Sequence, residues 1–226
     1  MKSKLVSVIT VCYNSSTTIK ETIESVNGQT YQNIEHIFID GKSTDGTLDI
    51  IRSTSIRNTK ITSEKDDGIY DAMNKGIALA RGDVIAILNS DDCFASKEIL
   101  AHVVTAFGQG IDIVYGNISY FKNDQNKLER FWRSSEYKGQ LFAEGWHPPH
   151  PAFFVSRRAY MKGGDFNTSL KIAADFDLMF RFLEVNQFRY KFLDETLVKM
   201  RLGGESNRSI KNVLKGNREV RASLQA

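Results

Sequence analysis

Gly82-Asp-Val-Ile-Ala-Ile-Leu-Asn-Ser-Asp-Asp92 is the stretch of this sequence that decides the fold. Its apolar run, Val84 to Leu88, is too short and too uniform for an amphipathic helix, so it predicts a strand buried on both faces, as in a parallel sheet. The stretch closes with two adjacent carboxylates, Asp91 and Asp92. Because open α/β sheets bind ligands at the carboxyl ends of their strands, the pair predicts a divalent-metal site that holds a diphosphate. The alternative is a helix cap before Lys97, a position that Ser and Asp favour.

Buried strands alternate with helices through the first 110 residues. Apolar runs rich in β-branched residues predict further strands, and capping residues followed by apolar positions at helical spacing predict helices. The strands are expected at residues 5–11, 34–40 and 60–64, and the helices at 17–26, after 43–47 and across 69–80. This alternation predicts an α/β fold with a parallel, doubly wound sheet and right-handed crossovers.

The pattern changes after Gly110, where two strands follow one another without a helix between them. His147-Pro-Pro-His-Pro151 predicts a rigid extended loop, because each proline pushes its predecessor out of helical space. Strands are expected at residues 111–121, 127–132, 152–155, 190–193 and 196–200, and a helix at 176–185.

The composition is that of an ordinary globular protein, with 41% hydrophobic and 25% charged residues. The net charge of +3 is too small to indicate a nucleic-acid partner. Cys12 and Cys93 lack CxxC spacing, which excludes a disulfide framework and a thiolate zinc site and fits a reducing compartment. The sequence predicts neither a signal peptide nor a membrane span, so we expect a soluble or peripheral protein in the cytoplasm.

Polar side chains follow the ends of four expected strands. They are Tyr13 with Asn14, Asp40, Glu64 to Asp66, and Asp91 with Asp92. Because the carboxyl ends of parallel strands lie along one edge of the sheet, these residues are expected to converge. Several carboxylates at one edge indicate a polar cleft, and the adjacent pair favours a hard cation with oxygen ligands, Mg²⁺ or Mn²⁺.

Five motifs come in the order seen in family 2 glycosyltransferases. They are Val8-Ile-Thr-Val-Cys-Tyr-Asn14, Ile39-Asp-Gly-Lys-Ser-Thr-Asp-Gly-Thr47, Gly68-Ile-Tyr-Asp-Ala-Met-Asn-Lys-Gly76, Ala80-Arg-Gly-Asp83 and Leu88-Asn-Ser-Asp-Asp92. The chain most resembles bacterial enzymes of exopolysaccharide, colanic acid or O-antigen assembly, and the likeness is dense over about the first 95 residues and sparser over the rest. The resemblance implies a GT-A fold, which is Rossmann-like with a mostly parallel central sheet flanked by helices. It also implies an inverting reaction and a nucleotide-sugar donor, commonly a uridine diphosphate (UDP) sugar.

The resemblance assigns the nucleotide site by position. Val11, Tyr13 and Asp40 are expected to line the nucleoside pocket, with Asp40 accepting a hydrogen bond from the base. Asp66 is expected beside the base or the ribose. Lys42 departs from the small residue expected in this loop, and it either reaches the diphosphate as a point charge or is solvated.

The resemblance also gives the two members of the acidic pair different roles. Asp92 is expected to be the direct metal ligand, and Asp91 a ribose or sugar contact as well as a second candidate ligand. Two further residues are expected to be structural. They are Asp83, and Asn74, which is expected to tie its helix to a neighbouring loop.

Ala174-Asp-Phe-Asp177 resembles the family's acidic catalytic motif, with Ala174 at the usual first acidic position. Asp175 is therefore the candidate general base for the acceptor hydroxyl, and Asp177 is expected to orient it or to contact the acceptor. A positioned base typically contributes roughly 10²–10⁴-fold to the rate. The alternative is that Asp175 only caps the helix that follows.

His147 and His150 lack the spacing of helical zinc ligands, and no Cys or Glu completes a set. A histidine near the position of His150 recurs in related enzymes, so we expect it to bind the acceptor or the metal–diphosphate, or else to anchor its loop. The segment from Gly203 to Ser206 resembles the family's late glycine loop, which is expected to close over the donor with Arg201 or Arg208 at the diphosphate. A plain surface turn is the alternative.

Residues 207–226 form a basic tail whose amphipathic pattern suits an anionic membrane surface. A solvated surface helix and a contact in a homo-oligomer are the alternatives. We expect one domain over residues 1–226, with a nucleotide-sugar-binding half at 1–110 and an acceptor-binding half at 111–206.

The expected reaction moves a sugar from a nucleotide-diphosphate donor to a hydroxyl of a saccharide or lipid-linked saccharide, by metal-assisted single displacement. It is expected in the cytoplasm, or peripherally at the inner face of the cell membrane. The alternative is a non-catalytic subunit that binds nucleotide sugar in a polysaccharide assembly complex.

Overall fold

The computed structural model describes residues 3–122, 124, 127–202 and 210–225, without the side chains of residues 210–214. Its strands are β1 (Val6–Cys12), β2 (Ile34–Asp40), β3 (Asn58–Ser63), β4 (Val84–Ile87), β5 (Cys93–Phe94), β6 (Ile113–Phe121), β7 (Arg130–Trp132), β8 (Phe153–Ser156) and β9 (Tyr190–Arg201). Its helices are α1 (Ile19–Asn27), α2 (Thr47–Thr54), α3 (Ile69–Leu79), α4 (Ile99–Ala106), α5 (Arg157–Gly163), α6 (Ala174–Phe180) and α7 (Ile210–Ser223). Two 3₁₀ turns, η1 (Leu141–Glu144) and η2 (His150–Ala152), and a π turn that continues α6, η3 (Arg181–Val185), complete the chain.

The nine strands belong to one sheet in the order β3-β2-β1-β4-β8-β6-β9-β5, with β7 beside β6. β3, β2, β1 and β4 are parallel to one another, which confirms the doubly wound first half. β8 joins the two halves, because it pairs antiparallel with β4 on one side and with β6 on the other. β9 lies parallel to β6 and antiparallel to β5.

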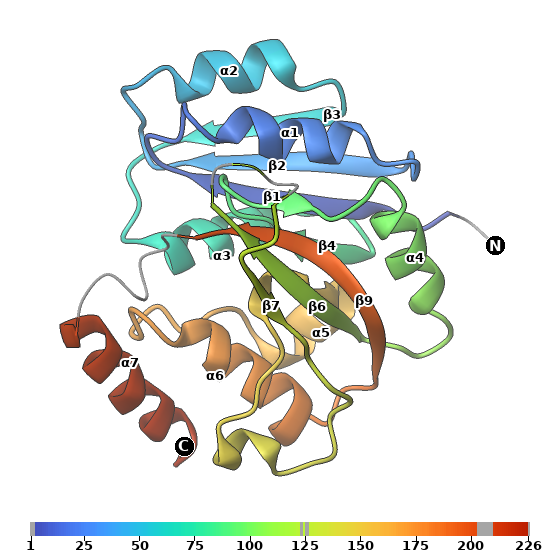
Figure 1. Ribbon diagram of the computed structural model, residues 1–226, viewed down its shortest axis with the longest axis vertical. Coiled ribbons are helices and arrows are strands. Elements are labelled where there is room, and N and C mark those ends of the chain that lie inside the picture. The colour runs from blue at the N-terminus through green and yellow to red at the C-terminus, as the bar shows by residue number, and fades with distance from the viewer. Residues whose placement is uncertain (1–2, 123, 125–126, 203–209, 226) are drawn as a thin grey trace.

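Helices cover both faces of the sheet (Figure 1), and alternate residues of the buried strands belong to different core clusters. Ile9, Ile37 and Ile85 belong to the cluster that includes residues of α3, α5 and α6. Their neighbours Val8 and Ala86 belong to the cluster beneath α4 and the end of α1. Because side chains alternate across a strand, a run that is apolar at every position needs helices on both faces of the sheet, and both faces are covered.

The structure corrects the second half of the expected elements. Residues 190–193 and 196–200 form a single strand, β9, rather than two. The polar residues between them lie at a bulge in the β6–β9 pairing, where Asn117 Nδ2 donates to Asp194 Oδ1 at 3.0 Å. The expected extended loop at His147–Pro151 gives way to η2 from His150 onward. α4, α5 and β5 were not predicted as separate elements.

The helix-cap alternative for Asp91 and Asp92 is wrong. β5 follows the pair directly and is hydrogen-bonded to β9. α4 begins at Ile99 after Glu98, whose side chain makes no capping hydrogen bond. The two carboxylates therefore lie in the turn between β4 and β5, outside any helix.

Within the part of the chain that the structure describes, no helix has the length and apolar character needed to cross a membrane.

Candidate functional site

The carboxyl ends of the parallel strands meet at one edge of the sheet, as the sequence predicts. Cys12 lies opposite Asp40, and Asp40 lies opposite Ser63. Leu88, at the end of β4, donates its backbone N–H to Ile9 of β1 at 2.9 Å. The polar turns that follow β1, β2, β3 and β4 are thereby brought to a common edge.

Asp91 and Asp92 form an acidic pair at this edge. Asp92 is 1% exposed, and its Oδ1 and Oδ2 accept hydrogen bonds from the backbone N–H of Arg201 at 3.1 Å and from Asn89 Nδ2 at 3.2 Å. Burial raises the pKa of Asp92 well above its usual value, and the charge of Asp91 raises it further. Burial also raises the pKa of Asp91. The pair is therefore hard to ionise without a cation beside it.

The donor set at this pair fits a hard divalent cation. Asp91 and Asp92 offer carboxylate oxygens, and the buried Asn89 Oδ1 has no hydrogen-bond partner among the described residues. Within the described ranges no group of three or more His, Cys, Asp or Glu side chains could hold a metal, at this pair or elsewhere. Mg²⁺ typically binds through one or two carboxylates plus substrate phosphates, so a pair is sufficient for it.

The exposed ring of Tyr13 and the carboxylate of Asp66 both lie against Gly41, at the same edge of the sheet as the acidic pair. Tyr13 is 65% exposed, unusual for so large a ring. A Cβ atom on Gly41 would lie 2.7 Å from Asp66 Oδ2 and 3.3 Å from Tyr13 Cδ2, so both side chains lie close against this glycine. Val11, near the end of β1, is buried in the core. The structure therefore brings together two of the residues expected at the nucleoside, Tyr13 and Asp66.

Asp40 is fully buried and is already hydrogen-bonded. Its Oδ2 accepts from the backbone N–H of Ser43 at 3.0 Å and from the Ser63 hydroxyl at 2.6 Å. The Cys12 thiol lies 3.8 Å from Oδ1. In this conformation Asp40 holds the loop that carries Lys42, and Lys42 itself is exposed with a left-handed φ of 69°.

The turns after β1 and β2 interlock through side chains that the sequence did not single out as site residues. Asn14 Oδ1 accepts from the backbone N–H of Thr44, and the Asn14 N–H donates to Ser43 Oγ. Asp45 accepts from the backbone N–H of Ser16 at 2.9 Å and from Thr47. These bonds, chiefly those to Thr47, hold the pKa of Asp45 below its usual range. Because both turns lie in the quoted motifs, the motifs also specify the rigid frame of the pocket.

Asp175 lies in the first turn of α6 and is half-buried. Its Oδ1 accepts a hydrogen bond from the backbone N–H of Phe176 at 2.9 Å, and the Tyr70 hydroxyl oxygen lies 3.3 Å from the same atom. Burial lowers the pKa of His150, while the negative charge of Asp175 acts in the opposite direction. Tyr70, His150 and Asp175 come from three distant segments, and the structure gathers them at one place.

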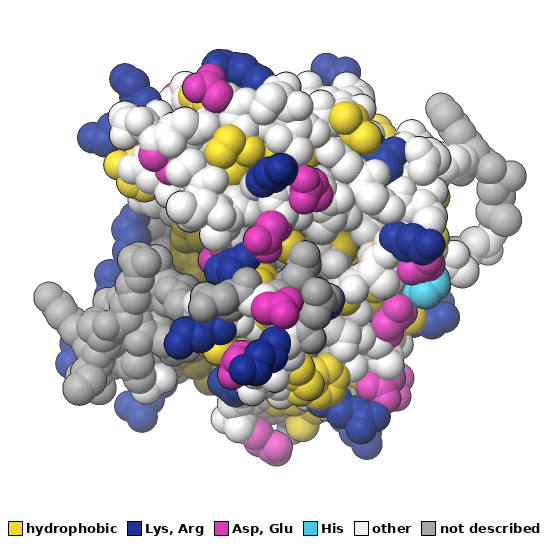
Figure 2. All heavy atoms as spheres, turned by 45° about the horizontal axis from the view of Figure 1, so that its top comes forward, with side chains coloured by type: hydrophobic (Ala, Val, Ile, Leu, Met, Phe, Trp, Pro, Cys, Tyr) yellow, Lys and Arg dark blue, Asp and Glu magenta, His cyan; other side chains and the backbone are white. Residues whose placement is uncertain are grey.

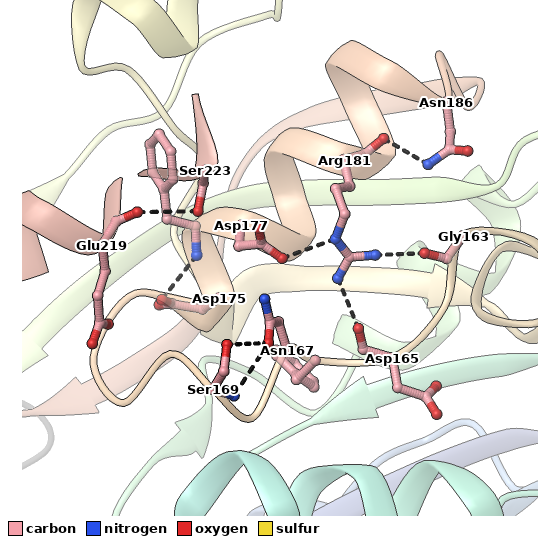
Figure 3. A network of polar contacts seen from close by, with 12 residues as sticks. Gly163, Asp165, Asn167, Ser169, Asp175, Asp177, Arg181, Asn186, Glu219 and Ser223 are labelled. Atoms are coloured by element: carbon pink, nitrogen blue, oxygen red, sulfur yellow. Dashed lines mark hydrogen bonds and ion pairs between the residues drawn. The ribbon is translucent and has the colours of Figure 1, made fainter. Parts of the chain in front are cut away.

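Asp177 does not contact Asp175. Its Oδ2 accepts from Arg181 Nε at 2.8 Å, and Arg181 also donates to the carbonyl oxygens of Gly163 and Asp165 (Figure 3). The Asp177 side chain is only 10% exposed. It therefore holds α6 to the chain that follows α5.

The guanidinium group of Arg201 is engaged within the protein. It donates to Glu21 Oε2 at 2.8 Å and to the carbonyl oxygen of Lys122 at 2.9 Å, and it lies 4.6 Å from the centroid of the Phe121 ring. The backbone N–H of Arg201 binds Asp92, so the residue supports the acidic pair. Gly203 to Ser206 and Arg208 lie outside the described residues.

Two structural expectations are confirmed. Asp83 Oδ2 accepts from the backbone N–H of Leu5 at 2.8 Å. Asn74 exchanges two hydrogen bonds, each 2.9 Å long, with the backbone of Phe166, so it ties α3 to a loop from the second half. Glu21, Tyr70 and Glu219 are the residues near the site that the sequence did not reveal. Tyr70 lies in a quoted motif, whereas Glu21 and Glu219 carry no local signal.

Acidic and basic side chains are interspersed over the face shown in Figure 2, rather than forming a field of one sign. A separate surface pocket of about 310 Å³ is lined by residues that include Lys4, Asp83 and Arg158. Lys4 and Asp83 precede β1 and β4, so this pocket lies at the amino ends of the strands, away from the acidic pair.

The family model described as glycosyl transferase family 2 matches residues 7–166. The chain belongs to this family. An uncharacterised glycosyltransferase of Mycobacterium tuberculosis is 32% identical over 188 residues, which are 78% of this chain and 68% of that protein. A glycosyltransferase of PGL/p-HBAD biosynthesis from Mycobacterium bovis is 29% identical over 186 residues, which are 80% of this chain and 70% of that protein. The expected enzyme class, glycosyltransferase, is confirmed by this membership.

Solved structures confirm the GT-A fold. S. aureus TarS 1–349, also solved in complex with UDP and with UDP-GlcNAc, matches with a TM-score of 0.72 at 20% identity. The mannosyltransferase PcManGT from Pyrobaculum calidifontis, in complex with GDP-Man and Mn²⁺, matches with a TM-score of 0.71 at 17% identity. These matches cover 97% and 98% of this chain but 65% of each of those chains. At such identities the likeness is one of fold.

Proposed function

We propose that this protein is an inverting glycosyltransferase that moves a sugar from a UDP-sugar to a hydroxyl of a saccharide or lipid-linked saccharide, by single displacement. The observation that carries the proposal is the acidic pair, Asp91 and Asp92, at the carboxyl end of β4. Its raised pKa values call for a cation. The Tyr13–Gly41–Asp66 corner lies at the same edge and offers a flat ring for a nucleobase.

The residues of the pair would hold Mg²⁺ or Mn²⁺, with Asp92 as the direct ligand and Asp91 as a second ligand or a ribose contact. When bound, the cation would stabilise the charge that develops on the departing diphosphate. Asp66 and Tyr13 would hold the nucleoside. Asp40 would hold the loop of residues 41–43 against the nucleoside. It would accept a hydrogen bond from the base only if that loop moved.

Asp175 would accept the proton of the acceptor hydroxyl. A sugar hydroxyl is a poor nucleophile, so proton removal in the transition state speeds its attack. His150 lies beside this carboxylate, where it would contact the acceptor or the diphosphate. Asp177 would serve by fixing α6, and Arg201 by fixing Asp92 rather than by meeting the diphosphate.

The choice of donor and acceptor draws on the relatives. TarS has been solved with UDP and UDP-GlcNAc, whereas PcManGT was solved with GDP-Man, so the nucleotide is the first point to test. The Mycobacterium bovis relative is named for PGL/p-HBAD biosynthesis, which supports an acceptor of the cell envelope and polysaccharide or glycolipid assembly. A cytoplasmic location with peripheral contact at the membrane, through the basic tail, and a homo-oligomer remain predictions.

The proposal is tested by thermal unfolding with UDP, GDP and their sugars, in Mn²⁺ and in EDTA. A ligand at about 100 times its dissociation constant adds roughly 2.7 kcal/mol of stability. We expect a metal-dependent shift with UDP that Asp92→Ala abolishes and that the exposed α2 control Asp49→Asn preserves. No shift with any nucleotide would remove the donor site.

Turnover separates the enzyme from the alternative, a non-catalytic nucleotide-sugar-binding subunit. Asp175→Asn is expected to lower kcat by roughly 10²–10⁴-fold while the UDP-induced shift stays the same. Wild-type turnover in Asp175→Asn would refute the base. A UDP shift without transfer to any acceptor would favour the binding subunit.

A further inference from the structure

The C-terminal helix α7 packs on the segment that leads into α6 (Figure 1). Val220 and Leu224 contact the core cluster that contains α6. A Cβ atom on Gly216 would lie 3.1 Å from Ile172 Cγ2, so the helix axis approaches this segment closely. Part of the apolar stripe expected to face a membrane is therefore buried against the protein.

Glu219 extends from α7 toward the segment before α6 (Figure 3). Its Oε2 accepts from the backbone N–H groups of Ile172 at 2.8 Å and Ala173 at 2.9 Å, and its Oε1 accepts from that of Lys171 at 3.1 Å. Burial acts to raise the pKa of Glu219, but these three bonds outweigh it and hold the pKa below its usual value. One carboxylate thus binds three consecutive N–H groups.

The same segment is connected to the candidate base through Tyr70. The Tyr70 hydroxyl donates to the carbonyl oxygen of Ile172 at 2.7 Å and lies 3.3 Å from Asp175 Oδ1. A hydroxyl has one proton to donate, so the shorter bond to Ile172 leaves the Asp175 carboxylate only a weak partner. If Ile172 moved away, the Tyr70 proton would turn to Asp175 and compete with the acceptor hydroxyl.

We propose that Glu219 is a positioning residue, which clamps residues 171–173 so that Ile172 retains the Tyr70 proton and Asp175 stays free to accept one. Glu219 touches neither donor nor acceptor in this arrangement. The proposal rests on the proposed function, because it needs Asp175 to be the base. It assigns the C-terminal helix a part in catalysis, beside the membrane contact expected from its sequence.

The test compares Glu219→Gln with the exposed control Glu24→Gln on α1. Glutamine keeps the size of the side chain, but its one oxygen cannot serve three N–H groups and its NH₂ group faces them. A shift of the clamped segment is expected to lower kcat by about 10- to 100-fold. The KM for the donor and the UDP-induced thermal shift are expected to stay at wild-type values, which general damage to the fold would not allow.

Tyr70→Phe supplies a second readout. In the Glu219→Gln background it removes the competing proton donor, so it is expected to restore part of the lost kcat. In the wild-type background it is expected to have a smaller effect. If Tyr70→Phe lowers kcat by the same factor in both backgrounds, the proposal is contradicted.

Asp175→Asn, measured alongside, separates the two levels of inference. If Asp175→Asn is inactive and Glu219→Gln has wild-type kcat, the clamp is refuted and the proposed function stands. If Asp175→Asn is active, the clamp and the assignment of Asp175 as the base both fail, while sugar transfer by the protein stands. Should Glu219→Gln not fold, Gly216→Ala gives the answer. Alanine favours the helix, but its Cβ atom crowds Ile172. A lowered kcat without lost stability therefore supports the clamp, and an unchanged kcat refutes it.

Discussion

Lys42 has a backbone conformation that favours glycine, although the residue carries a long charged side chain. Its φ of 69° lies in the left-handed region, which costs an ordinary residue roughly 1–2 kcal/mol and glycine almost nothing. This explains why a small residue is expected at the position. A charge kept despite strain is typical of a functional contact.

Lys42→Gly and Lys42→Asn both remove the charge while keeping a residue that tolerates this conformation. If Lys42 reaches the diphosphate, each variant is expected to weaken UDP binding by about 10-fold or more, the size of a hydrogen bond to a charged group. The free energy of unfolding is expected to change by no more than about 1 kcal/mol, because relief of strain is offset by the flexibility of the unfolded chain. Calorimetric titration with UDP gives the answer, and unchanged affinity in both variants would make Lys42 a solvated residue.

Asp92 makes metal binding depend on pH. Because its folded-state pKa is raised, the stability that its protonated form contributes is lost as the pH rises through that pKa. A cation binds the ionised form, so the increase in Tm caused by Mn²⁺ is expected to grow as the pH rises from about 4, the ordinary range of an aspartate, toward about 8. Asp92→Asn is expected to abolish this pH dependence of the Mn²⁺-induced increase in Tm, and Asp49→Asn is expected to retain it. A Mn²⁺ effect independent of pH would contradict the assignment.

At the scale of elements, α3 is the helix that joins the two ends of the site. Its first turn carries Tyr70, and Asn74 ties it to Phe166. Gly76 lets the helix lie against β1 and β2, because a Cβ atom there would lie 2.3 Å from Ile9 Cγ2.

Gly76→Ala is therefore expected to destabilise the protein by about 1–3 kcal/mol through overpacking, although alanine is the better helix former. Gly108→Ala is the matched control, since a Cβ atom there meets nothing within 4 Å. Urea unfolding of the two variants measures the difference. Equal stabilities would mean that α3 can move away from the sheet without cost.

The elements of the first half were predictable because their signals are local. The runs that form β1, β2 and β4 are short and rich in apolar, mostly β-branched residues, and α3 keeps its helical spacing. The second half was less predictable for the opposite reason. β9 contains a polar interruption that only its partner strand resolves, since Asp194 is paired with Asn117 and with Arg133.

At the scale of the whole molecule, His36 links stability to pH. It is fully buried in β2, where it contacts Thr10 at 3.0 Å, and burial lowers its pKa to about 3. The unfolded chain binds a proton near pH 6.5, so the free energy of unfolding is expected to fall as the pH drops from about 6.5 toward 3, by at most roughly 1.4 kcal/mol per pH unit.

His36→Gln is expected to flatten this slope, whatever its effect on stability at neutral pH. His102→Gln, at an exposed histidine on α4, is expected to leave the slope as it is. Chemical unfolding at several pH values compares the slopes. The same slope in His36→Gln as in the wild type would assign the acid sensitivity to other groups.

Local patterns of residues were enough to predict the doubly wound half and the acidic pair at the end of β4, because buried runs and strand ends are local features. The candidate base Asp175 followed from the resemblance of its motif to that of the family. Only the tertiary structure showed how those residues are held. Arg201 reaches Asp92 from 109 positions away, and Tyr70 reaches Asp175 from 105. Glu219 binds Ile172 from 47 positions away. Hydrogen bonds across such separations depend on how the chain returns to itself, which no local pattern of residues encodes.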